Sequence, residues 1–124
     1  MEDRAIDIVC LCAAWCRTCD GYAPVLAQVG AELVADNPRV RTHWIDIEDE
    51  ADLVGDVDVE TFPTLVVIGA DGVRFAGPLT PQPETLRRLL RATVSEPPAV
   101  AHWPAVAPEI AAFATRLRGR FADA

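Results

Sequence analysis

Lysine is missing from this sequence, since all eleven basic residues are arginine. Chemistry that forms a Schiff base on a lysine amine, or that uses lysine as a general base, is therefore excluded. No apolar run approaches the about 18 residues needed to span a membrane, so no membrane partner is expected. Acidic residues outnumber basic ones and give a net charge of −8, which argues against nucleic acid as a partner.

A basic leader is also missing, because residues 1–4 contain two acids and a single arginine. Without a secretory signal, the expected compartment is the cytoplasm. The 124 residues, 51% of them apolar, suffice for one soluble domain with a hydrophobic core. In a reducing cytosol, closely spaced cysteines are more often catalytic or metal-binding than structural. The four cysteines are therefore the first candidates for chemistry.

Two of these cysteines, Cys16 and Cys19, are separated by two residues. The apolar, β-branched run Ile6–Leu11 before them predicts a buried strand, and the residues from Cys16 to about Asp36 predict a helix. A thiol at a helix N-terminus meets unpaired N–H groups and the positive end of the helix dipole, which favour the thiolate. The thiolate is the form that attacks a disulfide, so this motif predicts a redox-active pair.

The chain resembles the thioredoxin family in four features that occur in the family's order. They are the motif Trp15–Cys19 at a strand-to-helix turn, Pro24 within the next helix, the segment Thr61–Leu65, and the segment Gly77–Thr80. The resemblance spans roughly residues 6–94. It implies a thioredoxin-like α/β fold that lacks the family's usual N-terminal strand and helix. It also implies that Pro63 is cis.

The resemblance implies thiol–disulfide exchange through a Cys16–Cys19 dithiol–disulfide couple, with no bound cofactor and no metal. Cys16, the more exposed thiol, would attack, and Cys19 would resolve the mixed disulfide. Arg17 and Thr18 would tune the couple, Arg17 through its charge beside the attacking sulfur.

The resemblance also implies which residues bind the substrate. Trp15, Phe62, Pro63 and Gly77 would form the surface that receives a disulfide-containing protein, whose extended backbone pairs beside Pro63. An unidentified reductant would restore the dithiol. The oligomeric state is left open.

Two positions depart from the family. Thioredoxins carry a buried carboxylate beneath the second cysteine and a lysine close to it, and these positions are Cys10 and Trp44 here. A buried thiol is a poor proton acceptor at neutral pH. Resolution by Cys19 is therefore expected to be slow.

Cys10 and Cys12 alternate along the first strand and so point to one face. They are small hydrophobes packed beneath the active-site helix, a pair that is redox-coupled to the active site, or, with Cys16 and Cys19, ligands of a four-thiolate zinc site. A further alternative for the whole chain is a non-catalytic thioredoxin-fold module that binds a protein partner. His43 and His102 receive no role.

The rest of the chain is predicted from its periodicity. A second strand over Arg39–Ile45 follows the first helix, so the two strands should be parallel. A short helix is expected over Glu48–Val54, a hairpin from Leu65–Ile68 and Val73–Ala76, and a helix over Pro83–Val94.

The sequence divides into a thioredoxin-like domain, residues 1–94, and an extension, residues 95–124. The extension has a Pro-rich connector and a C-terminal helix that packs on the domain. This helix is expected to cover the sheet face left open by the missing N-terminal elements, through an apolar stripe of Ile110, Phe113, Ala114, Leu117 and Phe121.

Overall fold

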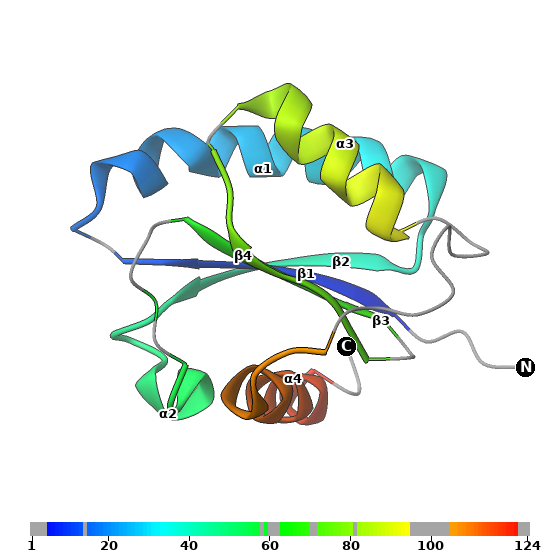
Figure 1. The fold of residues 1–124 in the computed structure, drawn as a ribbon. Coiled ribbons are helices and arrows are strands. Elements are labelled where there is room, and N and C mark those ends of the chain that lie inside the picture. Colours follow the sequence, from blue (N-terminus) through cyan, green and yellow to red (C-terminus); the bar gives the residue numbers. More distant parts are fainter. Residues whose placement is uncertain are drawn as a thin grey trace, which may run out of the picture.

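The structure, a computed structural model, describes residues 5–13, 15–57, 59, 63–69, 72–80, 82–94 and 105–121. Its elements are β1 (Ile6–Cys12), α1 (Arg17–Asp36), β2 (Val40–Asp46), α2 (Ala51–Val54), β3 (Thr64–Gly69), β4 (Gly72–Pro78), α3 (Pro83–Val94) and α4 (Pro108–Arg120). Figure 1 shows α1 and α3 over one face of a single sheet and α2 and α4 over the other. The predicted α/β fold with a C-terminal helix is confirmed. Within the described residues, no strand or helix precedes β1.

The sheet has the strand order β2-β1-β3-β4. β1 pairs with β2 in parallel through the α1 crossover, as the strand–helix–strand pattern predicted. β3 runs antiparallel to β1, and β4 pairs back on β3 as a hairpin. Every residue of β1 is buried, because helices cover both faces of the sheet. The register brings the carboxyl end of β1, the start of β3 and the end of β4 to the same end of the sheet.

One hydrophobic cluster fills the space between the sheet and the helices α1 and α3. The side chains from β1 in this cluster are Ile6, Ile8, Cys10 and Cys12, which alternate along the strand. Cys19 and Tyr22 reach the cluster from α1, and the partly exposed Cys16 packs against it. All four cysteines therefore belong to one side of the sheet.

A second cluster lies on the opposite face, between the sheet and the helices α2 and α4. From α4 it contains Phe113, Ala114 and Leu117, with Ile110 and Phe121 packed against it. These are the residues of the predicted apolar stripe. They contact the other alternating side chains of β1 and β3, so α4 covers this face of the sheet.

A buried carboxylate also ties α4 to the sheet. Asp7 on β1 accepts a hydrogen bond from Nε of Arg41 at 2.8 Å, lies 2.8 Å from Nε2 of His43, and forms an ion pair with Nε of Arg118 at 2.9 Å. Arg41 also donates to the carbonyl of Phe121 at 2.7 Å, just beyond α4. Burial raises the pKa of Asp7, but hydrogen bonds from His43 and Arg41 outweigh it and hold that pKa below its ordinary value.

Most element boundaries differ from the prediction by one or two residues, and α2 differs by more. α2 begins at Ala51 instead of Glu48, because the Asp46 carboxylate accepts hydrogen bonds from the N–H groups of Glu48 and Asp49 and holds them in a turn. Gly77, expected in a loop, lies within β4 opposite Leu65. The Pro-rich connector, residues 95–104, and the hairpin turn at residues 70–71 lie outside the described residues. None of the helices in the described ranges is long and apolar enough to cross a membrane.

Candidate functional site

The Cys16–Cys19 pair lies where β1 hands over to α1. Cys16 is the N-cap residue of α1, with an extended backbone (φ −89°, ψ 115°), and the helix begins at Arg17. Cys19 lies on the third residue of the helix and is 1% exposed, whereas Cys16 is partly exposed. The two thiols therefore have very different access to solvent although they are close in the chain.

The helix N-terminus stabilises the thiolate of Cys16. The backbone N–H of Cys19 is the main cause that lowers the pKa of Cys16 below its ordinary value, and the Cys19 thiol and Thr18 lower it further. These N–H groups are among the unpaired donors of the first helical turn, which any N-cap acceptor can use. The helix backbone is therefore the main cause of the lowered pKa of Cys16, and the side chain of Arg17 lies exposed.

The pKa of Cys19 moves in the opposite direction. Burial raises it first, and a side-chain hydrogen bond with Cys12 raises it further. At neutral pH the pair thus combines an activated, accessible thiol with a protonated, buried one. This asymmetry is what disulfide exchange by attack and resolution requires.

Cys12 forms a side-chain hydrogen bond with Cys19. Cys12 lies at the carboxyl end of β1, next to the start of α1, whereas Cys10 lies two residues further back on the same face. The sulfurs of Cys10 and Cys12 are 3.4 Å apart, and both side chains are at most 1% exposed. The hydrogen bond to Cys10 and burial together raise the pKa of Cys12.

Tyr22 adds a polar group to the same cluster. Its side chain is fully buried, and within the part of the chain that the structure describes its hydroxyl has no hydrogen-bond partner. Burial raises the pKa of Tyr22, and the nearby thiols of Cys10 and Cys12 raise it further. A buried hydroxyl without a partner is unusual, and here it lies near two thiols.

Trp44 and Cys10 are paired across β2 and β1, as expected of the positions that replace the family's charged pair. Trp44 is 41% exposed, because β2 is an edge strand. It lines a cavity of about 290 Å³ with Ala23, Leu26 and Ala27 of α1. The indole therefore lies beside α1 and brings no charge near the cysteines.

Trp15, Pro63 and Gly77 are the predicted substrate-binding residues that the structure describes. Trp15 is 64% exposed beside Cys16, and Thr18 is exposed as well. Pro63 is buried immediately before β3, at the end of the sheet where β1 leads to Cys16, and its carbonyl accepts a hydrogen bond from Leu79 N–H at 3.4 Å. Phe62 lies outside the described residues.

Gly77 lies in β4 near the same end of the sheet, where it pairs with Leu65, next to the terminal pair Thr64–Pro78. Among the residues that the structure describes, no group of three or more histidine, cysteine or acidic side chains is arranged to hold a metal ion.

Sequence reasoning missed two groups that the structure places beside other functional side chains. Tyr22 joins the cysteines in one cluster, and the i, i+3 spacing of Cys19 and Tyr22 was the available signal. Asp7 joins a network with Arg41, His43 and Arg118, and the signal was a lone acid inside an apolar strand. Such an acid is rarely fully buried unless it is paired.

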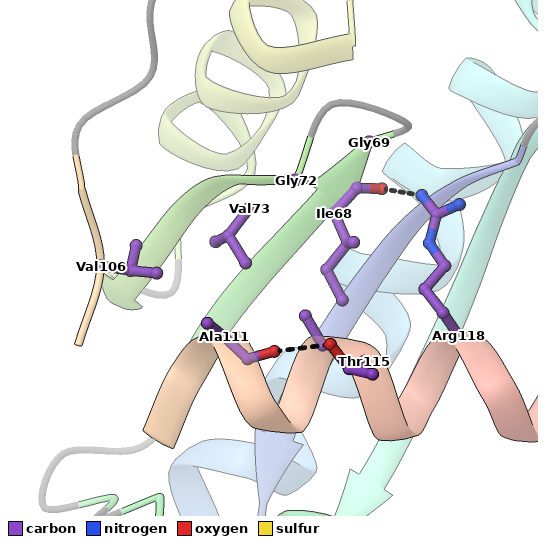
Figure 2. A pocket seen from close by; sticks show the side chains of 9 residues that line it. Ile68, Gly69, Gly72, Val73, Val106, Ala111, Thr115 and Arg118 are labelled. Atoms are coloured by element: carbon purple, nitrogen blue, oxygen red, sulfur yellow. Dashed lines mark hydrogen bonds between the residues drawn. The ribbon is translucent and has the colours of Figure 1, made fainter. Parts of the chain in front are cut away.

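A cavity of about 420 Å³ lies far from this chemistry, between α4 and the β3–β4 hairpin. Figure 2 shows its lining, with Ile68 and Val73 from the strands and Ala111, Thr115 and Arg118 from α4. Arg118 donates to the Ile68 carbonyl at 2.8 Å and to the Ala5 carbonyl at 2.7 Å, so its guanidinium ties the helix to the sheet. The cavity is on the sheet face opposite the cysteines.

The sheet, its helices and the cysteine pair at the start of α1 define a thioredoxin-fold protein. A family model described as Thioredoxin matches residues 2–87, more than half of the chain. The chain therefore belongs to the thioredoxin family.

Solved structures give the same fold. Thioredoxin from Fasciola hepatica matches with a TM-score of 0.60 and 20% identity, over 74% of this chain and 85% of that one. The germline-specific thioredoxin Deadhead from Drosophila melanogaster matches with a TM-score of 0.60 and 15% identity, over 71% and 80%. The first two thioredoxin domains of Saccharomyces cerevisiae Eps1p match with a TM-score of 0.60 and 22% identity, over 73% of this chain but 35% of that one. A search of curated protein sequences gives no match.

Proposed function

We propose that this protein is a thiol–disulfide oxidoreductase that acts through a Cys16–Cys19 couple. The observation that carries the proposal is the opposite perturbation of the two thiols: the helix N-terminus lowers the pKa of Cys16, while burial raises that of Cys19. Membership of the thioredoxin family supports the same reaction class. An inert structural pair has no need of this asymmetry.

The reaction proceeds in two exchanges. The Cys16 thiolate attacks one sulfur of the substrate disulfide, whose S–S bond breaks and releases a thiolate. Cys19 then loses its proton and attacks the Cys16 sulfur, which closes the Cys16–Cys19 disulfide and releases the second substrate thiol. A separate reductant returns two electrons and two protons to the couple.

The surface around Cys16 suits a protein substrate. Trp15 offers a large exposed apolar ring directly before the attacking sulfur. Pro63 and Gly77 lie at the same end of the sheet, so an extended segment could pass over Trp15 toward them. We propose that disulfide-containing proteins in the cytoplasm are the substrates.

Trapping tests the assignment of roles. Cys19→Ser leaves the attacking thiolate but no resolving thiol, so a model disulfide protein such as insulin should accumulate as a mixed disulfide on Cys16. Cys16→Ser is the matched control and should trap nothing. Non-reducing gels and intact mass spectrometry report the adduct.

The outcomes separate the possible assignments. Trapping by Cys16→Ser alone would invert the two roles. Trapping by neither variant, together with a wild-type protein that does not reduce insulin, would favour the non-catalytic binding module.

A further inference from the structure

The structure contains two thiols that the proposed reaction does not use. Cys10 and Cys12 are buried on the active-site face of the sheet, with their sulfurs 3.4 Å apart. Cys12 also hydrogen-bonds to Cys19, and Cys19 interacts with Cys16. The four sulfurs thus form a continuous series from the surface into the core, in the order Cys16, Cys19, Cys12, Cys10.

The surroundings of this series favour exchange between its members over reaction with solvent. Cys10, Cys12 and Cys19 are at most 1% exposed, so only the partly exposed Cys16 can meet an external disulfide directly. The hydroxyl of Tyr22 lies near Cys10 and Cys12 and has no hydrogen-bond partner among the described residues. The contacts between the sulfurs are therefore in place inside the core.

We propose that Cys10 and Cys12 form a second, buried dithiol couple that exchanges its disulfide with the Cys16–Cys19 couple through contact between Cys12 and Cys19. This inference rests on the proposed function, because the surface couple supplies the oxidised partner. The buried couple allows one protein molecule to hold two disulfides.

The transfer consists of two balanced steps. The Cys12 thiolate attacks the Cys19 sulfur of the Cys16–Cys19 disulfide, so a Cys12–Cys19 bond forms and Cys16 leaves as a thiolate. The Cys10 thiolate then attacks the Cys12 sulfur, which forms a Cys10–Cys12 disulfide and releases Cys19. The protons of Cys10 and Cys12 end on Cys16 and Cys19, so no other oxidant or reductant is consumed.

Strand geometry permits the buried disulfide. Same-face neighbours on a strand are about 6.6 Å apart, from a rise of roughly 3.3 Å per residue. Disulfides usually join Cα atoms about 4.4–6.8 Å apart, so a Cys10–Cys12 bond lies within this range, near its long end. The high pKa of Cys12 makes the first step faster at alkaline pH.

Thiol counting on the full-length protein is the direct test. The protein is oxidised with excess diamide at pH 8.5, denatured, and alkylated with iodoacetamide, and its intact mass is measured. Oxidation of the surface couple alone leaves two alkylated thiols, whereas oxidation of both couples leaves none of the four cysteines alkylated. We expect the second result.

Peptide mapping then identifies the bonds. Chymotrypsin accepts large apolar side chains and cleaves after Leu11, Trp15 and Tyr22. Three peptides then separate the cysteines: one ending at residue 11 with Cys10, residues 12–15 with Cys12, and residues 16–22 with Cys16 and Cys19. A Cys10–Cys12 bond joins the first two peptides. A Cys12–Cys19 bond joins the last two.

Two variants test the route of transfer. Cys19→Ala keeps both buried thiols but removes the connecting sulfur, so Cys10 and Cys12 should both remain alkylatable after diamide treatment. Cys10→Ala blocks the second step and should accumulate the peptide pair 12–15 and 16–22. Far-UV circular dichroism checks that each variant is folded.

Failure of this inference is distinguishable from failure of the proposed function. Wild-type protein with a Cys16–Cys19 disulfide and two free thiols at Cys10 and Cys12 would overturn the relay and leave the oxidoreductase intact. A Cys10–Cys12 bond that forms equally in Cys19→Ala would overturn the route through Cys19. A wild-type protein that forms both disulfides yet never reduces insulin would overturn the proposed function alone.

Discussion

Phe113 is the side chain on which the packing of α4 depends most, and its replacement by alanine gives a sharp test of the fold. Phe113 is 0% exposed and lies in the cluster that α4 shares with the sheet and α2. Truncating a fully buried phenylalanine to alanine costs about 3–5 kcal/mol through lost burial and the cavity left behind. Because a domain of this size is stable by about 5–15 kcal/mol, Phe113→Ala should remove a large part of the free energy of unfolding.

Urea denaturation followed by far-UV circular dichroism measures this loss. The midpoint should fall while the slope stays unchanged, because the surface exposed on unfolding is nearly the same. Thr115→Ala is the matched control on the same helix: Thr115 is exposed and its hydroxyl donates to the Ala111 carbonyl of its own helix, so the change should stay within about 0.5 kcal/mol.

A loss below about 1 kcal/mol for Phe113→Ala would refute the packing of α4 on the sheet. A chain that ends after Val94 extends the test, because it removes α4 entirely. It should bind a dye for exposed apolar surface and unfold at lower urea, since the second cluster then loses its cover.

Three further predictions follow from titration. Iodoacetamide should modify Cys16 in preference to the other thiols at pH 7, because the helix backbone lowers its pKa; equal labelling of Cys19 would contradict this. Attack by Cys19 on the mixed disulfide at Cys16 should accelerate as pH rises, because burial raises the pKa of Cys19. Stopped-flow mixing measures the rate of this step, and a fast, pH-independent rate would argue for another proton acceptor. The pKa of the Asp7 carboxyl is lowered in the folded protein, so Asp7 stabilises the fold at pH values above its unfolded pKa near 3.8, and this stabilisation is lost as pH falls through the folded pKa. In Asp7→Asn the urea midpoint should therefore change less with pH between about pH 5 and pH 2 than it does in the wild type.

The redox potential of the Cys16–Cys19 couple can also be predicted relative to that of thioredoxin. A stabilised Cys16 thiolate favours the reduced form, so the Cys16–Cys19 couple should be more oxidising than the approximately −270 mV of thioredoxin. Equilibration with glutathione buffers measures it in Cys12→Ala, which removes the thiol that exchanges with Cys19 and so isolates the surface couple. A potential that lies below −270 mV by more than about 10 mV would contradict the expectation.

Most of the fold could be predicted from the sequence alone, because local patterns carried it. Alternation and β-branching over Ile6–Leu11, helical spacing in the next segment and the strand that follows fixed a parallel βαβ unit. The paired cysteines were equally local, since a motif at a strand-to-helix junction implies an N-cap position. The bounds of α3 were predicted without error, because Pro83 begins it and an apolar stripe runs to Val94.

Tertiary structure decided what lies next to what. The sequence pointed to Cys10 as the residue beneath Cys19, but it could not show that Cys12 hydrogen-bonds to Cys19, because this contact depends on where β1 ends and how α1 lies over it. No local pattern could pair Asp7 with Arg118, because 111 positions separate them and only the packing of α4 brings them to 2.9 Å. The sequence determined which thiols exist and how they alternate along the strand. The packing of a helix on a sheet determined which sulfur touches which, because that distance is set by residues far apart in the chain.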